Sequence, residues 1–131
     1  MHAQCSYDYA VIRVVPRVER QEFLNAGVIL WCQAQDFLEA RVALDEARLR
    51  ALDAAVDVDA VRRHLASFPI ICVGGKDSGP IGKLSKRERF DWLVAPRSTI
   101  IQTSAVHSGR CTDVSATLAR LLDSMVHPAR N

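Results

Sequence analysis

The stretch GVILWCQAQDFLEARVA, residues 27–43, carries the pattern that decides the fold. It begins with the apolar run GVILWC, and its last seven residues alternate apolar side chains with Glu39 and Arg41. Short runs of this kind, bounded by glycine and polar residues, are typical of strands. The QAQD connection between them is short enough for an antiparallel hairpin. We therefore expect two neighbouring antiparallel strands here.

Three further runs have the character of strands. Residues 7–15 are rich in Tyr, Val and Ile and are followed by Pro16, which has no N–H to donate to a sheet. The run IICV, residues 70–73, follows Pro69, at which we expect a helix to end. Residues 98–106 are rich in β-branched side chains. The polar stretch RVERQEF, which follows Pro16, predicts one helical turn or a long loop.

Helical periodicity fills most of the remaining chain. The predicted N-caps are Asp45, Asp57, Ser85 and Asp113. The first two head either two short helices or one bent helix. Ser85 and Glu88 fit a capping box for a helix over residues 86–94, which Pro96 ends. The side chains expected to face inward are Leu49, Leu52, Val56, Val58, Val61, Leu65, Phe68, Phe90, Leu93, Val94, Val114, Leu118, Leu121, Leu122 and Met125.

The order of these elements predicts an α+β fold, because strands and helices do not alternate regularly. We expect a single compact domain over residues 1–131, since a chain of this length can bury one core without staples. The sheet is predicted to be antiparallel or mixed, with about four to five strands and with helices packed mainly on one face. Residues 74–83 contain five Gly or Pro residues in ten and are expected to form a loop.

The composition excludes several classes of protein. Seventeen Lys and Arg against fifteen Asp and Glu give a net charge of only +2, which offers no electrostatic argument for a nucleic-acid or membrane partner. The four cysteines include no C-x-x-C pair, so we expect reduced, structural thiols. A leader pattern is missing from the N-terminus, and apolar runs fall far short of the ~20 residues of a membrane span. We therefore expect a cytoplasmic location.

Catalytic and cofactor motifs are missing or incomplete. Residues 74–83 suggest a phosphate loop, but Asp77 stands where its first glycine is required and Leu84 where its Ser or Thr is required. A Ser-His-acid triad can be drawn around His107, yet nothing like G-x-S-x-G is present. We interpret His64 as an ordinary surface or core residue. The sequence predicts no cofactor and no metal site, and it identifies no catalytic residue.

The densest positive cluster is Lys83, Lys86, Arg87 and Arg89. Such a run is usually a solvated face, but cations at the start of a helix oppose its dipole slightly. Phosphates of a nucleic acid or an acidic partner surface would explain this placement. Aromatic side chains that could stack on bases do not interleave with the segment.

Two other pairs of polar residues raise the question of a site. Glu22 and Asn25 would project from one side of a helical turn, although we favour the interpretation that Asn25 caps the turn and Glu22 pairs with Arg13 or Arg20. Arg97 and His107 flank the predicted strand of residues 98–106. In a flat, extended strand they would lie ~33 Å apart, so a shared pocket requires a bend or bulge.

Three motifs together resemble a known family. They are Y-x-x-x-R-x-x-P in residues 9–16, E-F-x-N-x-G-V-I-L in residues 22–30, and W-L-x-x-P-R-S-T-x-I-Q-T-S-x-V-H-S-G in residues 92–109. Over nearly its whole length the chain is similar to DUF3037, a bacterial family of small proteins of unknown function often encoded beside a HipA-like kinase gene. The resemblance implies a compact α+β protein of the bacterial cytoplasm. Gln21 stands where the family leads us to expect glycine, and Ala105 where proline is commoner.

The resemblance also marks individual positions. Carried over residue by residue, it marks Arg13, Pro16, Glu22, Asn25, Gly27, Pro96, Arg97, Ser98, Gln102, His107 and Gly109. The candidate functional cluster is Arg13, Glu22, Asn25, Arg97, Ser98, Gln102 and His107.

Three hypotheses about function follow. The first is a non-enzymatic interaction or regulatory module, an accessory partner of a HipA-like kinase, as the family resemblance implies. The second is a small enzyme or a phosphate- or oxyanion-ligand binder that uses the candidate cluster, because arginine binds planar oxyanions and histidine can transfer protons near neutrality. The third is nucleic-acid binding through residues 83–89.

Overall fold

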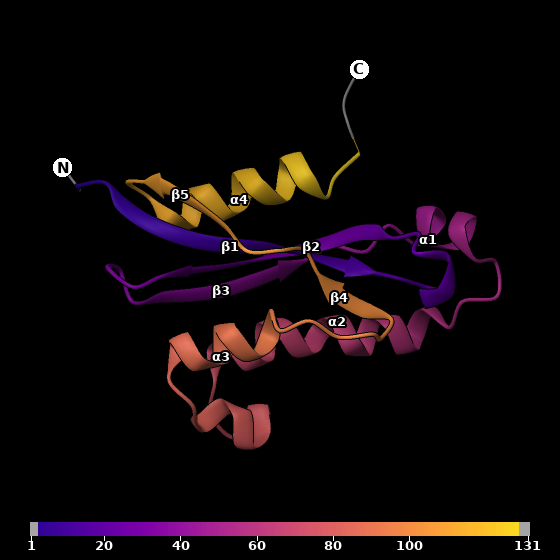
Figure 1. Ribbon diagram of the computed structural model, residues 1–131, viewed down its shortest axis with the longest axis horizontal. Helices are drawn as coiled ribbons and strands as arrows, with labels where there is room; N and C mark the ends of the chain where they lie inside the picture. The colour runs from indigo at the N-terminus through magenta and orange to yellow at the C-terminus, as the bar shows by residue number, and fades with distance from the viewer. Residues whose placement is uncertain (1–2, 129–131) are drawn as a thin grey trace.

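The computed structural model describes residues 3–128, which form one open sheet with helices on both of its faces (Figure 1). In this part of the chain the strands are β1 (Cys5–Val14), β2 (Leu24–Cys32), β3 (Phe37–Val42), β4 (Ile101–Thr103) and β5 (His107–Cys111). Their order is β3-β2-β1-β4, and β5 also pairs with β1. All of these pairings are antiparallel. The predicted α+β class and antiparallel sheet are confirmed.

The central strand β1 has neighbours along both edges. One edge pairs with β2, while the other pairs with β5 over its first half and with β4 near its end. The predicted hairpin of β2 and β3 is confirmed, with Gly27 opposite Val42 and Cys32 opposite Phe37. A Cβ atom on Gly27 would lie 2.7 Å from the backbone oxygen of Arg41. The close approach of these two strands therefore requires glycine at this position.

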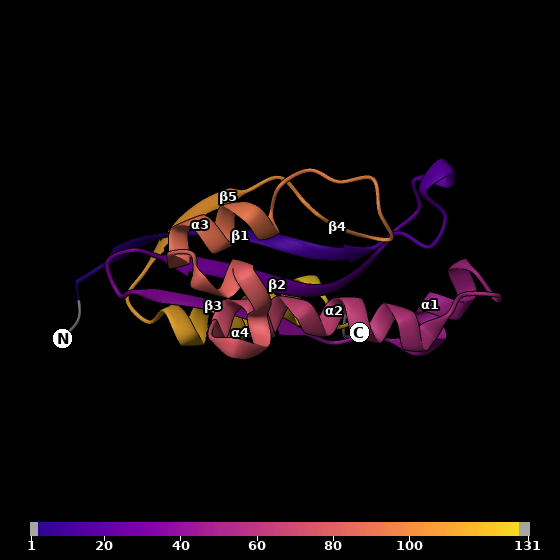
Figure 2. The same ribbon diagram turned by 90° about the horizontal axis from the view of Figure 1, so that it is seen from below.

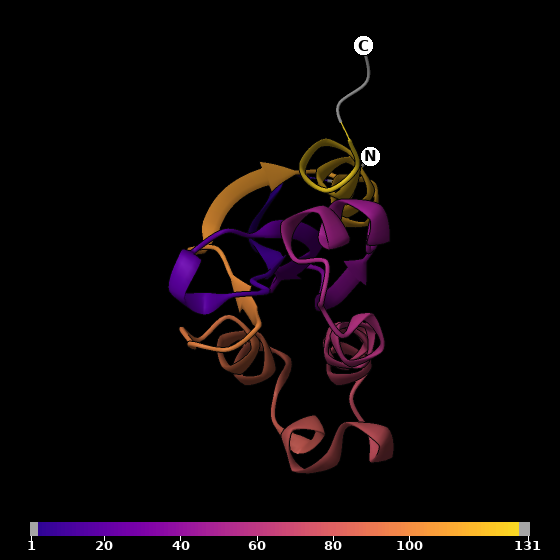
Figure 3. The ribbon, with the colours of Figure 1, turned by 90° about the vertical axis from the view of Figure 1, so that its right-hand side faces the viewer.

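The helices are α1 (Glu46–Leu52), α2 (Val58–Val73), α3 (Lys86–Leu93) and α4 (Val114–Met125), with short 3₁₀ segments η1 (Val18–Arg20) and η2 (Lys76–Lys83). As predicted, most of them lie on one face of the sheet, where α2 and α3 contact each other and cover the strands when the molecule is seen from below (Figure 2). The exception is α4, which covers the opposite face, as the end-on view shows (Figure 3). The polar stretch after Pro16 forms the predicted helical turn, η1.

The two faces of the sheet carry separate apolar layers. Successive residues of β2 contribute to each in turn, so that Ile29 packs towards α2 and α3 whereas Leu30 packs towards α4. This explains why the GVILWC run is apolar throughout, since a strand buried on both faces has no polar side. On the α4 side Leu118 is fully buried, and its replacement by alanine should cost about 2–5 kcal/mol.

The predicted helix starts are confirmed. The carboxylates of Asp45, Asp57 and Asp113 each accept a hydrogen bond of 3.1 Å from a backbone N–H in the first turn of α1, α2 and α4. Ser85 and Glu88 form the complete capping box at the start of α3. Each cap contributes about 0.5–2 kcal/mol to the stability of its helix. Asp45 and Asp57 therefore head two separate helices.

The prediction that the helix ends at Pro69, with a strand over residues 70–73, is wrong. Helix α2 continues through Pro69 to Val73, although a proline inside a helix removes one backbone hydrogen bond. Two contacts offset this loss. Ile71 and Cys72 are buried in the core, and the guanidinium of the buried Arg89 donates to both of their backbone oxygens at 2.8 and 2.7 Å. Arg89 thereby donates hydrogen bonds to carbonyl groups that the end of α2 leaves free.

The prediction of one strand over residues 98–106 is also wrong. Only Ile101–Thr103 is a strand there, and His107 begins the next strand instead of ending this one. Between the two strands the chain has three residues where β1 has two, which makes a bulge. Ser104 maintains the connection, because its hydroxyl oxygen accepts the Val11 N–H at 2.9 Å and its own N–H donates to the Val11 oxygen at 2.8 Å.

Two smaller expectations also change. Met125 was expected to face inward, but it lies in the last turn of α4 and is 37% exposed. The expected loop at residues 74–83 includes η2, which is kinked at Gly79, where φ is 63°. Helix α2, the longest within residues 3–128, is like the others there too short or too polar to cross a bilayer.

Candidate functional site

A row of polar side chains crosses three strands on the α4 side of the sheet. Arg13 of β1 is paired with Asn25 of β2 on one side and with Gln102 of β4 on the other. Residues directly opposite each other on antiparallel strands project from the same face, with Cβ atoms about 5 Å apart. Asn25 reaches the end of α4, where its amide donates to the Met125 backbone oxygen at 3.0 Å. The register thus brings together three residues of the candidate cluster.

Arg13 lines a hollow of about 290 Å³ at the edge of the sheet, which we call the arginine hollow. Its lining includes Arg13, Val18, Phe23, Arg97, Ser98 and Gln102. Four of these belong to the candidate cluster. A fifth member, Asn25, is paired with Arg13 on the neighbouring strand β2. The side chains that line this hollow include no Asp, Glu, His or Cys.

The loop that carries Arg97 and Ser98 is fastened to the sheet at several points. The Val15 N–H donates to the Ile100 oxygen at 2.7 Å, which continues the pairing beyond β4. The Gln102 side-chain amide donates to the Thr99 oxygen at 2.9 Å. These bonds hold Arg97 and Ser98 beside the end of β1.

Both arginines of the hollow stack on exposed aromatic rings. The Arg13 guanidinium carbon lies 4.2 Å from the centre of the Phe23 ring, and that of Arg97 lies 4.6 Å from the Trp92 ring. Arg97 also donates to the Trp92 backbone oxygen. Neither arginine forms an ion pair with a residue of the described part of the chain. Stacking fixes the plane of a guanidinium while its N–H groups remain available at the edge.

Two buried polar atoms of the row have no hydrogen-bond partner within residues 3–128. They are Nε of Arg13 and Oδ1 of Asn25, on directly paired residues. A buried polar group without a partner costs about 1–3 kcal/mol, and folded proteins contain few of them. Such atoms are frequent at functional sites, where a ligand supplies the missing bond. The row is therefore incomplete as a purely structural network.

The remaining two residues of the candidate cluster lie elsewhere. Glu22 pairs with Arg20 at the surface and does not line the arginine hollow. His107 is paired with Tyr9 and stacks on its ring at a centroid distance of 5.5 Å. Tyr9 is four residues from Arg13 on β1, or roughly 13 Å along the strand. The bulge between β4 and β5 does not bring Arg97 and His107 into one pocket.

Sequence reasoning missed the two aromatic partners. Phe23 and Trp92 are 46% and 41% exposed, so they contribute little to the core. Both stand inside the motifs quoted for the family, and large exposed aromatics in such motifs were the available signal. The expectation of glycine at position 21 has a structural basis, because Gln21 has a left-handed backbone conformation with φ 58°.

The basic segment of residues 83–89 does not present a continuous positive surface. Lys86 pairs with Asp36 at 2.9 Å, and Arg87 pairs with Asp91 one turn along α3. Arg89 is buried and bound to backbone oxygens of the protein. Lys83 is exposed beside the loop glycines Gly75 and Gly79. Three of its four cations thus have partners within the protein.

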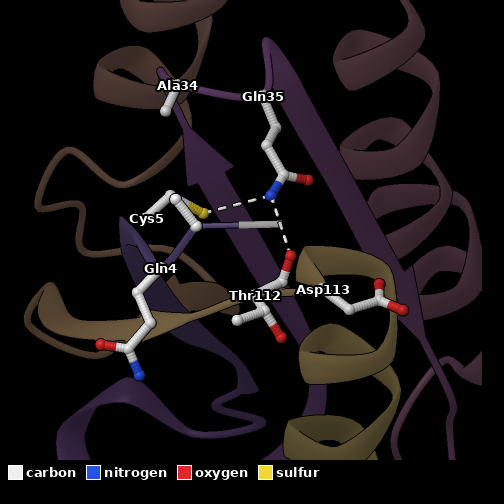
Figure 4. Close-up of a pocket in the computed structure, with 7 residues that line it drawn as sticks. Gln4, Cys5, Ala34, Gln35, Thr112 and Asp113 are labelled. Atoms are coloured by element: carbon white, nitrogen blue, oxygen red, sulfur yellow. Dashed lines mark hydrogen bonds between the residues drawn. The ribbon is translucent and has the colours of Figure 1, made fainter. Parts of the chain in front are cut away.

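A second hollow, of about 510 Å³, lies at the opposite end of β1 (Figure 4). We call it the cysteine hollow, and its lining includes Gln4, Cys5, Ala34, Gln35, Thr112 and Asp113. Gln35 extends across it and donates to the Cys5 sulfur at 3.2 Å and to the Thr112 oxygen at 3.1 Å. The Cys5 sulfur lies 3.5 Å from that of Cys32.

Two buried thiols, Cys5 beside this hollow and Cys72 in the core on the other face of the sheet, are poor nucleophiles at neutral pH. Burial, followed by the neighbouring thiols of Cys32 and Cys111, raises the pKa of Cys5 to about 11. Burial likewise raises the pKa of Cys72, in α2, to about 12. A raised pKa leaves the thiol protonated at pH 7, whereas the thiolate is the reactive form. Among residues 3–128, no group of three or more His, Cys, Asp or Glu side chains is placed to hold a metal ion.

The fold and the arginine hollow describe a small α+β protein whose sheet edge carries two arginines without acidic partners among the described residues. The profile of a family described as a protein of unknown function, DUF3037, matches residues 9–126. The chain therefore belongs to the DUF3037 family, as its three motifs predicted. Neither a curated protein nor a solved structure matches it.

Proposed function

We propose that this protein is a non-enzymatic binding module that recognises an oxyanion, a phosphate or carboxylate group, in the arginine hollow. One observation carries the proposal: Arg13 and Arg97 line a single hollow, and neither has an acidic partner among the described residues. Two guanidinium groups that share a concave surface repel each other, and an anion between them would offset this repulsion. Phosphate and carboxylate match the guanidinium geometry with paired N–H donors.

The neighbouring groups support the same ligand. Ser98 adds a hydroxyl donor to the hollow, and the Arg13 Nε–H is a donor without a partner among residues 3–128. The stacked rings of Phe23 and Trp92 reduce the side-chain freedom that the arginines would lose on binding. An oxyanion would therefore meet preorganised donors at low entropic cost.

The proposal of binding without catalysis rests on the side chains of the hollow. General acid–base chemistry needs a group that titrates near neutral pH within hydrogen-bond reach of the reacting atoms. His107 and Glu22, the two members of the candidate cluster that could take this role, lie outside the hollow. The titratable side chains inside it are Arg13 and Arg97, and guanidinium groups stay protonated.

The test is a calorimetric titration of the full chain with inorganic phosphate and with acetate. Arg13→Ala and Arg97→Ala should each weaken phosphate binding about tenfold or more. Arg120→Ala is the matched control, because Arg120 is an exposed arginine on α4 that is not part of the hollow. Equal phosphate affinity in all four proteins, or no binding of either anion, would refute the proposal.

A second candidate is a protein partner that presents the anionic group, and the family resemblance makes a HipA-like kinase the first partner to test. The observation in its favour is a group of exposed apolar side chains: Val18 and Phe23, which line the hollow, are 37% and 46% exposed, and Trp92, which stacks on Arg97, is 41% exposed. Trp and Arg are the residue types most enriched at the centres of interfaces. Co-purification of the kinase with the native chain, and its loss with Phe23→Ser, would support this partner. Equal recovery with both chains would count against it.

A further inference from the structure

A third hollow lies against the other side of the loop that carries Arg97. Its volume is about 500 Å³, and its lining includes His64, Ser67, Phe68, Arg97, Thr99 and Ile100. We call it the histidine hollow. It lies between α2, which contributes His64, Ser67 and Phe68, and the loop in front of β4.

Arg97 lines both this hollow and the arginine hollow. The next two residues separate them, because Ser98 faces the arginine hollow and Thr99 faces the histidine hollow. A ligand that contacts Arg97 can therefore extend from one hollow into the other.

The histidine hollow has the composition of a site for a flat ring. Phe68 and Ile100 provide apolar surface, and His64, Ser67 and Thr99 provide groups that can hydrogen-bond to the edge of a ring. A guanidinium such as that of Arg97 also stacks on heterocycles. The residues that line the two hollows include no Asp or Glu, so a cationic ligand would find no counter-charge.

We propose that the two hollows form one bipartite site for a phosphomonoester that carries a heterocyclic ring, the chemistry of a nucleoside monophosphate. The phosphate occupies the arginine hollow between Arg13 and Arg97, and the ring occupies the histidine hollow beside His64. This inference rests on the proposed function, because it places the ligand's anionic group at the proposed oxyanion site.

The experiment compares four kinds of probe by calorimetry on the full chain: inorganic phosphate, ribose 5-phosphate, adenosine, and the 5′-monophosphates of adenosine, guanosine, cytidine and uridine. At least one nucleotide should bind about tenfold more tightly than ribose 5-phosphate, since the ring adds stacking and hydrogen bonds. Adenosine alone should bind more weakly than the nucleotides. If no nucleotide binds more tightly than ribose 5-phosphate, the bipartite site is refuted while the oxyanion site stands. If inorganic phosphate does not bind, the bipartite site is refuted, and the oxyanion site fails as well if acetate does not bind.

Variants of α2 separate the two hollows. Ser67→Trp fills the histidine hollow and should reduce nucleotide affinity to that of ribose 5-phosphate without changing the affinity for inorganic phosphate. His64→Ala, which keeps the hollow open, should weaken nucleotide binding about threefold by removing one hydrogen-bonding group. Arg63→Ala is the control, because Arg63 is exposed on the same helix but lines neither hollow.

Thermal melting establishes that each variant is folded. If Ser67→Trp proves unfolded, His64→Ala with its Arg63→Ala control carries the test. Nucleotide affinity that is unchanged in a folded Ser67→Trp protein, or in His64→Ala where that variant carries the test, would overturn the assignment of the ring to this hollow.

Discussion

The two ends of β1 differ in how their polar groups are satisfied. At the Cys5 end, polar groups of the larger hollow bond to one another. The Cys5 thiol donates to the Cys111 oxygen, and the Gln35 amide donates to the Cys5 sulfur and to the Thr112 oxygen. At the Arg13 end, the smaller hollow contains two arginines that have no acidic partner in the described part of the chain. The Arg13 Nε and Asn25 Oδ1 atoms likewise have no hydrogen-bond partner there. Volume favours the cysteine hollow as a site, whereas chemistry favours the arginine hollow.

This difference teaches that hydrogen-bonding groups without partners identify a binding site better than the volume of a hollow does. A hollow whose polar groups already bond to one another offers a ligand only the exchange of existing bonds. A hollow with unpartnered donors gains bonds outright when an anion enters. The four predictions that follow test this contrast, from the largest expected effect to the smallest.

The first prediction fills each hollow with the same bulky side chain. Ser98→Trp should occupy the arginine hollow and weaken phosphate binding about 100-fold, or ~2.7 kcal/mol, in a calorimetric titration. Ala34→Trp should occupy the cysteine hollow and leave the affinity unchanged. Both positions are exposed, so neither change should disturb the core. The opposite result, with Ala34→Trp as the damaging variant, would reverse the comparison.

The second prediction concerns stability measured by urea unfolding. Arg13→Met should raise the free energy of unfolding by about 0.5 kcal/mol, because it removes the unpartnered Nε–H while methionine keeps the contact with Phe23. Cys5→Ser should lower it by about 1 kcal/mol, since the apolar surroundings of Cys5 disfavour a more polar hydroxyl. A loss of more than 1 kcal/mol in Arg13→Met would show that Arg13 is mainly structural.

The contrast between the two ends also shows what the sequence could predict. Local signals were sufficient for the hairpin at Gly27, the N-caps at Asp45, Asp57 and Asp113, and the capping box of Ser85, because each depends on residues close in the chain. The extent of α2 could not be predicted in the same way. The continuation through Pro69 depends on Arg89, a residue twenty positions away that reaches the end of the helix only in the folded protein.

The candidate site was predictable only in part, because its residues come from separate motifs that meet only in the folded protein. The motifs marked Arg13, Asn25, Arg97, Ser98 and Gln102, and the structure brings these five together through the register of β1 with β2 and β4. Register is a tertiary property, so sequence alone could not separate them from Glu22 and His107. The bulge at Ser104 is the clearest example of a feature that the sequence could not predict. In the sequence Ser104 is an ordinary strand residue, but in the folded protein its hydroxyl oxygen takes the place of a backbone acceptor for the Val11 N–H.

The third prediction uses pH to distinguish the two ends. Because burial and the Cys32 and Cys111 thiols raise the pKa of Cys5 to about 11, its alkylation by iodoacetamide should be slow at pH 7 and should rise about tenfold per pH unit up to that value. Mass spectrometry of the Cys5 peptide follows this rate. The stability of the fold should decrease between pH 9 and about 11, because the unfolded chain loses the Cys5 proton first.

Binding of sulfate at the arginine hollow should change little over pH 7–9, since guanidinium stays protonated. Rapid alkylation of Cys5 at pH 7 would contradict the closed state of the cysteine hollow.

The fourth prediction removes the side chain that closes the cysteine hollow. Gln35→Ala should lower the free energy of unfolding by only about 0.5 kcal/mol, because Gln35 is exposed and its bonds to the Cys5 sulfur and the Thr112 oxygen compete with bonds to water. The same change should raise the alkylation rate of Cys5 about threefold at pH 9, since the amide no longer covers the sulfur. Gln33→Ala, in the same turn, is the control, because Gln33 does not line the cysteine hollow. If Gln35→Ala also conferred new phosphate binding that survives Arg13→Ala, the cysteine hollow would be a second anion site, and internal hydrogen bonding would be what conceals it.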